Sequence, residues 1–154
     1  MIDNNQKYET YRLLKLRLKK ALVNSFWFEA LMIEYAIVED RTSSILQYAG
    51  VCSNAFDPNK MLSNKLNSIR LQIEKGHPIL SVKTTTALID EIKMWKDSRN
   101  EIVHRACNHV YDEEKTKNIA LIGENLVKRL DNDSRKIRNA CKKENTYSMI
   151  TIKM

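Results

Sequence analysis

The chain has 154 residues, of which 43% are hydrophobic and 29% charged, and this composition excludes an intrinsically disordered protein. Only three glycines and two prolines are present, so long uninterrupted helices are expected rather than short strands joined by turns. A formal net charge of +7 favours polyanionic partners such as nucleic acid, although charge alone identifies no partner.

The spacing of the apolar residues predicts helices in chain order over about residues 6–23, 24–49, 60–75, 83–110 and 112–143. Between them, Asp57-Pro58-Asn59 predicts a turn and "HPILSV" (77–82) an extended link. The final stretch "TYSMITIKM" alternates like a short strand. We therefore predict one all-α domain over residues 1–154. It is an antiparallel bundle of four to five helices with a core of about residues 6–143 and a tail at 144–154.

Two of these helices carry surface patterns that bear on function. The first has a basic stripe of Arg12, Lys15 and Lys19, which is either a solvated face or a strip facing phosphates. The second is apolar around nearly its whole circumference between Phe26 and Val38. A helix of that kind is buried on more than one side, so we expect a central position or a subunit interface.

The cysteines and the apolar segments indicate a soluble cytoplasmic protein without membrane contact. Cys52, Cys107 and Cys141 are odd in number and scattered, which suits a reducing compartment. The polar N-terminus resembles no secretory signal. The stretch "FWFEALMIEYAIV" is interrupted by Glu29 and Glu34, and it is shorter than the ~20 residues that a membrane span needs.

Neither a metal site nor a cofactor is expected. Cys107 lies close to His104 and His109, but a structural zinc site needs two close pairs of ligands, and His77 and Cys52 are isolated. Cys107 is expected to be a small buried residue, and His109 to serve packing or the surface. The chain has no glycine-rich phosphate loop, no GxSxG elbow and no HExxH pair.

The segment "RNEIVHRACNH" (99–109) holds the candidate site. The polar run that ends at Asn100 interrupts an apolar helix pattern, which costs stability unless the run is solvated or functional. Asn100 and His104, four residues apart, share a helix face and could hydrogen-bond, and Glu101 and Arg105 predict an ion pair at the same spacing. Arg99 and His104 are separated by about 7.5 Å and about 140° on an ideal helix, so they should not touch within one chain.

The six residues "RNEIVH" resemble the Arg-x4-6-His motif of the HEPN superfamily (higher eukaryotes and prokaryotes nucleotide-binding), whose most common version has a polar residue after the arginine, as at Asn100. The motif's place on a penultimate helix and the preceding Trp95 agree with that family. So does "FWFEALMIEYAIVEDRTSSIL", which is similar to the long second helix of some bacterial members. The resemblance spans roughly residues 6–143 in layout, while "RNEIVH" is its motif-specific part.

HEPN domains are helical bundles, and many are metal-independent endoribonucleases of toxin–antitoxin, phage-defence and RNA-targeting CRISPR systems. The resemblance implies that Arg99 and His104 are catalytic, that Asn100 assists, and that RNA is the substrate. It implies a homodimer, formed through the second and the motif-bearing helices, in which two motifs share one cleft. An antitoxin or defence-complex partner is implied as well. Toxins silenced by a nucleotidyltransferase antitoxin carry a tyrosine where this chain has Ala106, which argues against AMPylation-type control.

These residue types suit RNA cleavage in which the 2′-OH is the nucleophile. Histidine titrates close to neutral pH, so His104 can serve as base or acid. Arg99 can direct two donors at phosphate oxygens, and the products are a 2′,3′-cyclic phosphate and a 5′-hydroxyl. Two alternatives stay open: a non-catalytic HEPN-like module that binds RNA, a nucleotide or a protein, and a helical interaction protein whose Arg99 and His104 face solvent. The sequence also leaves open whether Glu34, Glu39 or Asp40 joins the site.

Overall fold

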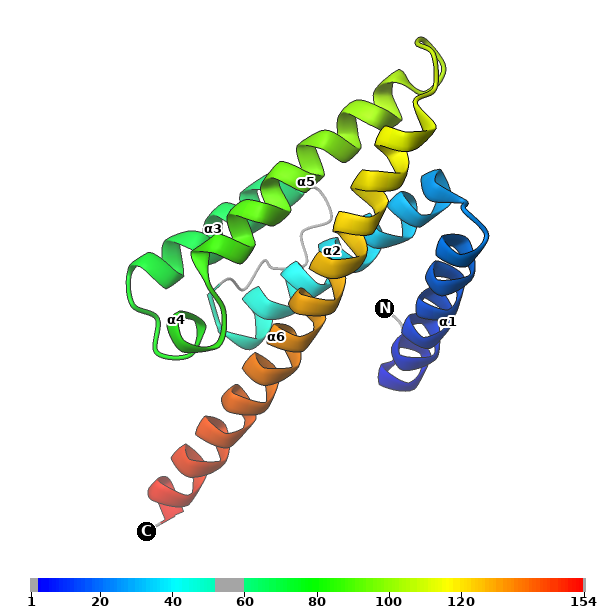
Figure 1. Cartoon of the computed structure of the whole chain (residues 1–154). Coiled ribbons are helices and arrows are strands. Elements are labelled where there is room, and N and C mark those ends of the chain that lie inside the picture. Colours follow the sequence, from blue (N-terminus) through cyan, green and yellow to red (C-terminus); the bar gives the residue numbers. More distant parts are fainter. Residues whose placement is uncertain (1–2, 52–59, 154) are drawn as a thin grey trace. The chain divides into compact units, whose positions relative to one another are not determined.

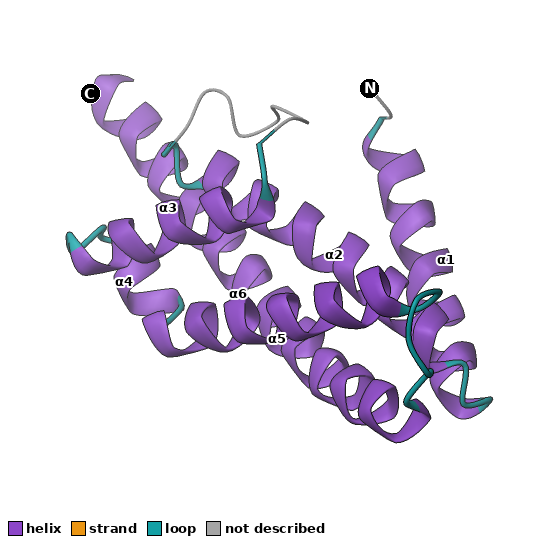
Figure 2. Ribbon diagram, turned by 90° about the horizontal axis from the view of Figure 1, so that it is seen from above, coloured by secondary structure: helices purple, strands orange, loops and turns teal. Residues whose placement is uncertain are grey.

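The computed structural model describes residues 3–51 and 60–153, and all regular secondary structure in these ranges is helical (Figure 2). The helices are α1 (Asn4–Val23), α2 (Trp27–Tyr48), α3 (Leu62–Glu74), α4 (Leu80–Lys83), α5 (Thr86–Arg105) and α6 (Glu113–Lys153) (Figure 1). The all-α prediction is confirmed, with six helices in the described ranges instead of four or five. None of these helices combines the length and apolar character that crossing a membrane requires. The predicted turn at 57–59 and Cys52 lie outside the described residues.

The extra helix is α4, and it lies where an extended link was predicted at residues 77–82. The ring of His77 accounts for this difference. Its Nδ1 accepts hydrogen bonds from the backbone N–H groups of Ile79 and Leu80, each at 3.2 Å. Because Nδ1 accepts, the proton is on Nε2, which donates to the carbonyl of Ala49 at 3.2 Å. A residue that looked isolated in sequence therefore caps a helical turn and ties it to the end of α2.

The connection between α5 and α6 begins earlier than predicted, since α5 ends at Arg105 and not at Val110. Asp112 starts the next helix: its carboxylate accepts from the backbone N–H of Lys115 at 2.9 Å, as an N-cap does. Cys107 lies in this connection and is exposed, so the prediction that it is buried was wrong. The chain has already left the helix at Cys107, and its side chain therefore no longer faces the core.

The tail at 144–154 is helical through Lys153, so the final stretch "TYSMITIKM" (146–154), whose alternation is typical of a short strand, continues α6 instead. Met149 and Ile150 are neighbours in sequence, and both are exposed on this last part of α6. In a half-buried strand, one of two neighbouring side chains would be buried. A strand needs a partner for its backbone groups, whereas each added helical residue bonds to the turn before it. The tail therefore continues the helix that precedes it.

The chain divides into two compact units. One comprises Met1–Ile37 with Trp95–Asn125, and the other comprises Val38–Met94 with Leu126–Met154. Helices α2, α5 and α6 each contribute a segment to both units. The candidate site residues all belong to the unit of Met1–Ile37 with Trp95–Asn125, which we call the N-terminal unit.

Polar contacts in the second unit show that α3 and α5 run antiparallel. Arg70 binds Asp90 at 3.0 Å and Lys93 binds Asn67 at 2.9 Å, so numbers rise along α3 as they fall along α5. The core of this unit includes aliphatic side chains from α2, α3, α4, α5 and α6, among them Val38, Ile45, Leu46, Leu62, Leu66, Ile69, Leu80, Leu88, Ile89, Ile92, Leu126, Leu130 and Ile137.

The N-terminal unit contains α1, the first part of α2, the last part of α5 and the first part of α6. Its core includes Leu18, Ala21, Ala30, Leu31, Ile33, Ile37, Trp95 and Ala120. Trp95 Nε1 donates to the carbonyl of Ile119 at 3.1 Å, and Glu101 pairs with Lys115 at 3.5 Å. The two contacts make α5 and α6 an antiparallel hairpin, whose last α5 turns carry the candidate site.

Candidate active site

The three predicted site residues lie on the last turns of α5. Arg99 and Asn100 are half-buried and His104 is exposed. Arg99 Nη1 donates to Asn100 Oδ1 at 3.1 Å, so the asparagine amide orients the guanidinium. Within the described ranges no hydrogen bond or ion pair joins His104 to either residue. The separation of about 140° on one helix predicts this for Arg99, whereas the hydrogen bond that the four-residue spacing allowed between Asn100 and His104 does not form in this part of the chain. One chain thus holds the arginine and the histidine apart.

Two side chains of α2 hold Arg99, and neither was predicted. The guanidinium carbon lies 4.3 Å from the centroid of the Tyr35 ring, a cation–π contact. Nη2 lies 3.0 Å from the sulfur of Met32. Met32 and Tyr35 are three residues apart, so they project from one side of α2. This spacing could have indicated from the sequence that Met32 and Tyr35 share a helix face, but it does not reveal which helix packs against that face.

Arg99 is a cation without an anionic partner in the described part of the chain. Among the residues that the structure describes, no carboxylate lies within ion-pair distance of its guanidinium, and its buried Nε has no hydrogen-bond partner. Burial lowers the pKa of Arg99 from its usual value, and the Tyr35 hydroxyl acts in the opposite sense. A desolvated, unneutralised guanidinium is costly unless it serves to bind an anion, and its planar donor set fits phosphate.

Of the three acidic candidates on the second helix, Glu34, Glu39 and Asp40, only Glu34 belongs to the N-terminal unit. It is 0% exposed, and neither of its oxygens has a hydrogen-bond partner within the described chain. Burial, and secondarily the charge of Glu124, raise its pKa to about 9. Glu34 is therefore protonated at neutral pH and does not neutralise Arg99. Glu39, by contrast, lies 3.8 Å from Lys65 in the second unit.

Gly123 of α6 provides the space that Glu34 occupies. A Cβ at this position would collide with Glu34 Oε2 and lie 2.6 Å from Trp95 Nε1. We expect Gly123→Ala to lower the free energy of unfolding by about 1–3 kcal/mol, because overpacking of a closed core outweighs the gain in helix propensity. Urea denaturation followed by circular dichroism measures this change.

The matched control is the double variant Glu34→Ala/Gly123→Ala, which removes the carboxyl that the new methyl group would strike. The loss caused by Gly123→Ala should be smaller in the Glu34→Ala background, giving a coupling energy in a double-mutant cycle. Strictly additive effects of the two substitutions would show that the Glu34 side chain is not the reason why position 123 needs glycine.

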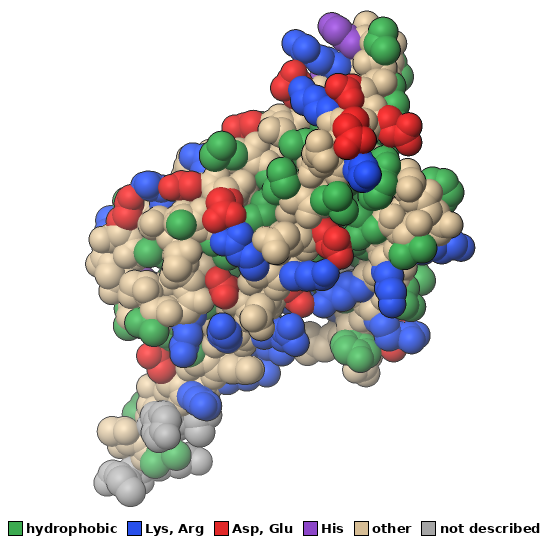
Figure 3. Space-filling view, viewed as in Figure 1, with side chains coloured by type: hydrophobic (Ala, Val, Ile, Leu, Met, Phe, Trp, Pro, Cys, Tyr) green, Lys and Arg blue, Asp and Glu red, His purple; other side chains and the backbone are tan. Residues whose placement is uncertain are grey.

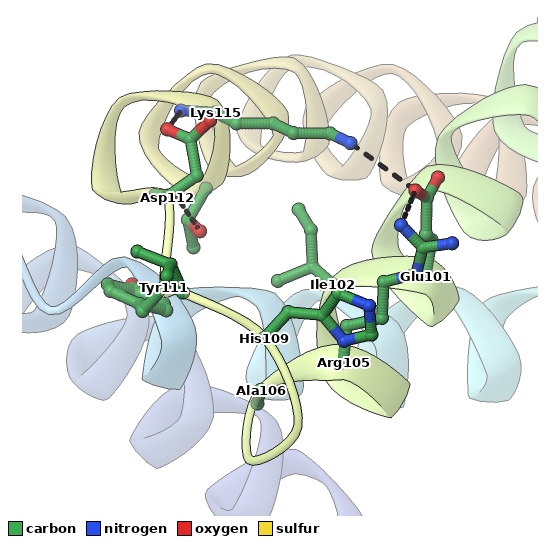
Figure 4. A pocket seen from close by; sticks show the side chains of 10 residues that line it. Glu101, Ile102, Arg105, Ala106, His109, Tyr111, Asp112 and Lys115 are labelled. Atoms are coloured by element: carbon green, nitrogen blue, oxygen red, sulfur yellow. Dashed lines mark hydrogen bonds and ion pairs between the residues drawn. The ribbon is translucent and has the colours of Figure 1, made fainter.

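A cleft of about 390 Å³ opens between the end of α5 and the start of α6 (Figure 4). Glu101 stands at its edge and pairs with Arg105 at 3.4 Å, which confirms the predicted i,i+4 contact, and with Lys115. His109 and Tyr111 also line the cleft, whereas Arg99 and His104 do not. On the face seen in Figure 3, basic and acidic side chains lie next to one another around this α5–α6 connection.

The described residues thus define an all-α protein with an arginine held by Tyr35 and Met32 and an exposed histidine on one helix. They contain no group of three or more histidine, cysteine or acidic side chains that could hold a metal ion. Comparison with protein-family models, with curated proteins and with solved structures finds no match for this chain. The likeness to the HEPN superfamily therefore rests on residues 99–104 and their helical setting.

Proposed function

We propose that this protein is a metal-independent endoribonuclease of HEPN type, which acts as a homodimer with a composite site of Arg99, Asn100 and His104. The observation that carries the proposal is the state of Arg99. It is a half-buried cation, stacked on Tyr35 and without a carboxylate partner in the described chain. Such a guanidinium is preorganised to receive a phosphate through two parallel hydrogen bonds.

The chemistry assigns one task to each residue. His104 removes the proton from a ribose 2′-OH, whose oxygen attacks the neighbouring phosphorus, and the bond from phosphorus to the 5′-oxygen breaks. His104 of the partner subunit returns a proton to the leaving 5′-oxygen. Arg99 stabilises the charge that builds on the phosphorane, and Asn100 keeps the guanidinium in place. The products are a 2′,3′-cyclic phosphate and a 5′-hydroxyl.

A second copy of the chain is needed because Arg99 and His104 point about 140° apart on one helix. We assign the dimer contact to α2 and the motif-bearing α5. Phe26, just before α2, and Met32 on α2 support this assignment, since they are 55% and 44% exposed. A toxin–antitoxin or phage-defence setting, with an antitoxin or defence-complex partner, follows from the resemblance of "RNEIVH".

The test uses purified full-length protein and labelled single-stranded RNA in the presence of EDTA. Cleavage that persists in EDTA and leaves 2′,3′-cyclic phosphate ends, identified by mass spectrometry, is the expected result. Light scattering on the same sample should report a dimer. Diverse RNAs left intact, with or without EDTA, would overturn the nuclease, and an active monomer would overturn the composite site.

A non-catalytic RNA-binding module of the same type is the second candidate. The observation in its favour is that Arg99 is held by its neighbours, while no hydrogen bond or ion pair in the described ranges joins the exposed His104 to Arg99 or Asn100. A module of that kind would bind RNA without cleaving it, with an affinity unchanged by His104→Ala and reduced by Arg99→Ala.

A further inference from the structure

We infer that the cleft between α5 and α6 binds one unpaired nucleotide of an RNA strand, with its base on Tyr111 and its phosphate between Arg105 and Lys115. This inference rests on the proposed function and adds the substrate class of the same active site: single-stranded RNA held beside the cleaved bond. It concerns residues that the Arg99 and His104 site does not use.

The phosphate position is suggested by the ion pairs at the cleft edge. Glu101 places one carboxylate between two cations, 3.4 Å from Arg105 and 3.5 Å from Lys115 (Figure 4). All three side chains are about half exposed, and exposed pairs of this geometry contribute little to stability. A phosphate can therefore take the place of the carboxylate at small cost, while Glu101 turns to solvent.

The base position is suggested by the remaining walls. Ile102 and Ala106 are half-buried, and Tyr111 is 47% exposed. An exposed tyrosine ring beside an aliphatic wall offers a stacking surface to a base, which single-stranded RNA can present and a duplex cannot. The volume of about 390 Å³ lies within the range of small-ligand pockets.

The cleft also lies close to the candidate catalytic histidine along the chain. Arg105 directly follows His104, and the cleft residues at the end of α5 are 101, 102 and 105, with 106 just after the helix. This spacing places them on one face. An RNA strand whose reacting phosphate lies at His104 would therefore reach the cleft within the length of one helical turn of α5. The site would hold a neighbouring nucleotide and set the strand's register.

Binding is tested with a 2′-O-methyl RNA oligonucleotide, which has no 2′-OH nucleophile, by fluorescence anisotropy on the full chain. Tyr111→Leu should weaken binding by about 5- to 50-fold because stacking is lost, whereas Tyr111→Phe should stay within about twofold of wild type. Glu101→Gln should tighten binding by roughly threefold or more, because it releases both cations, and Lys115→Ala should weaken it. Lys75→Ala removes an exposed lysine of the second unit and serves as the charge control.

Equal affinities for Tyr111→Leu and Tyr111→Phe, or weaker binding by Glu101→Gln, would overturn the nucleotide cleft, as would equal binding of duplex and single strand. These outcomes can be distinguished from a failure of the proposed nuclease activity. If the protein cleaves RNA but substitutions of Tyr111 leave the RNA affinity unchanged, only the nucleotide cleft is contradicted. If the protein shows the full binding pattern but does not cleave RNA, only the nuclease is contradicted.

Discussion

Replacing His104 with alanine is expected to lower the rate of RNA cleavage by at least about 100-fold, the usual contribution of a general acid or base. Binding of the uncleavable 2′-O-methyl oligonucleotide should change little, because His104 acts on protons and not on phosphate charge. Arg99→Ala should reduce both the rate and the affinity, and Arg99→Lys should not restore the rate, since a lysine lacks the planar pair of donors. Initial rates in EDTA and anisotropy on the same variants measure the two effects.

His109 provides the matched control for this result. It is a histidine of the same segment, exposed like His104 and five residues further along the chain. His109→Ala should keep most of the rate at saturating RNA, because His109 is not in the catalytic motif. Since His109 lines the proposed nucleotide cleft, any effect of this substitution should appear in RNA affinity and not in the rate at saturation. An equal fall in both variants would contradict the assignment of His104, and a fully active His104→Ala protein would contradict the proposed chemistry.

The contribution of Glu34 to the stability of the protein is expected to fall as pH rises. The pKa of Glu34 in the folded chain is about 9, against an ordinary 4.5. The fold therefore favours the protonated form of Glu34. Its contribution to the free energy of unfolding is complete below pH 4.5, and it declines as pH rises from there through the folded pKa. Between pH 4.5 and pH 7 the decline amounts to roughly 3 kcal/mol.

The measurement compares wild type with Glu34→Gln by urea denaturation from pH 5 to pH 8.5. Glutamine keeps the shape without the titration, so the variant should gain stability over wild type steadily as pH rises. The Glu124→Gln control should reduce this slope only slightly, because burial is the largest cause of the shift and Glu124 the second. Identical pH profiles for wild type and Glu34→Gln would mean that Glu34 is not buried in the protonated form.

Much of the fold follows from the sequence because it depends on local interactions. Three glycines and two prolines leave few places for a helix to stop, and the period of the apolar residues predicts α1. The pairing of Glu101 with Arg105 and the separation of Arg99 from His104 also follow from the helical repeat. These features need no information from distant parts of the chain.

The setting of the candidate site depends on contacts between residues far apart in sequence. Arg99 meets Met32 across 67 positions, and His77 caps α4 while bonding to the carbonyl of Ala49 28 positions earlier. The burial of Glu34 likewise depends on what α5 and α6 place around it. Sequence spacing determines which residues share a helix face, but only tertiary packing decides which faces meet. Packing therefore decides that Arg99 is held by an aromatic ring and lacks a carboxylate partner in the described chain.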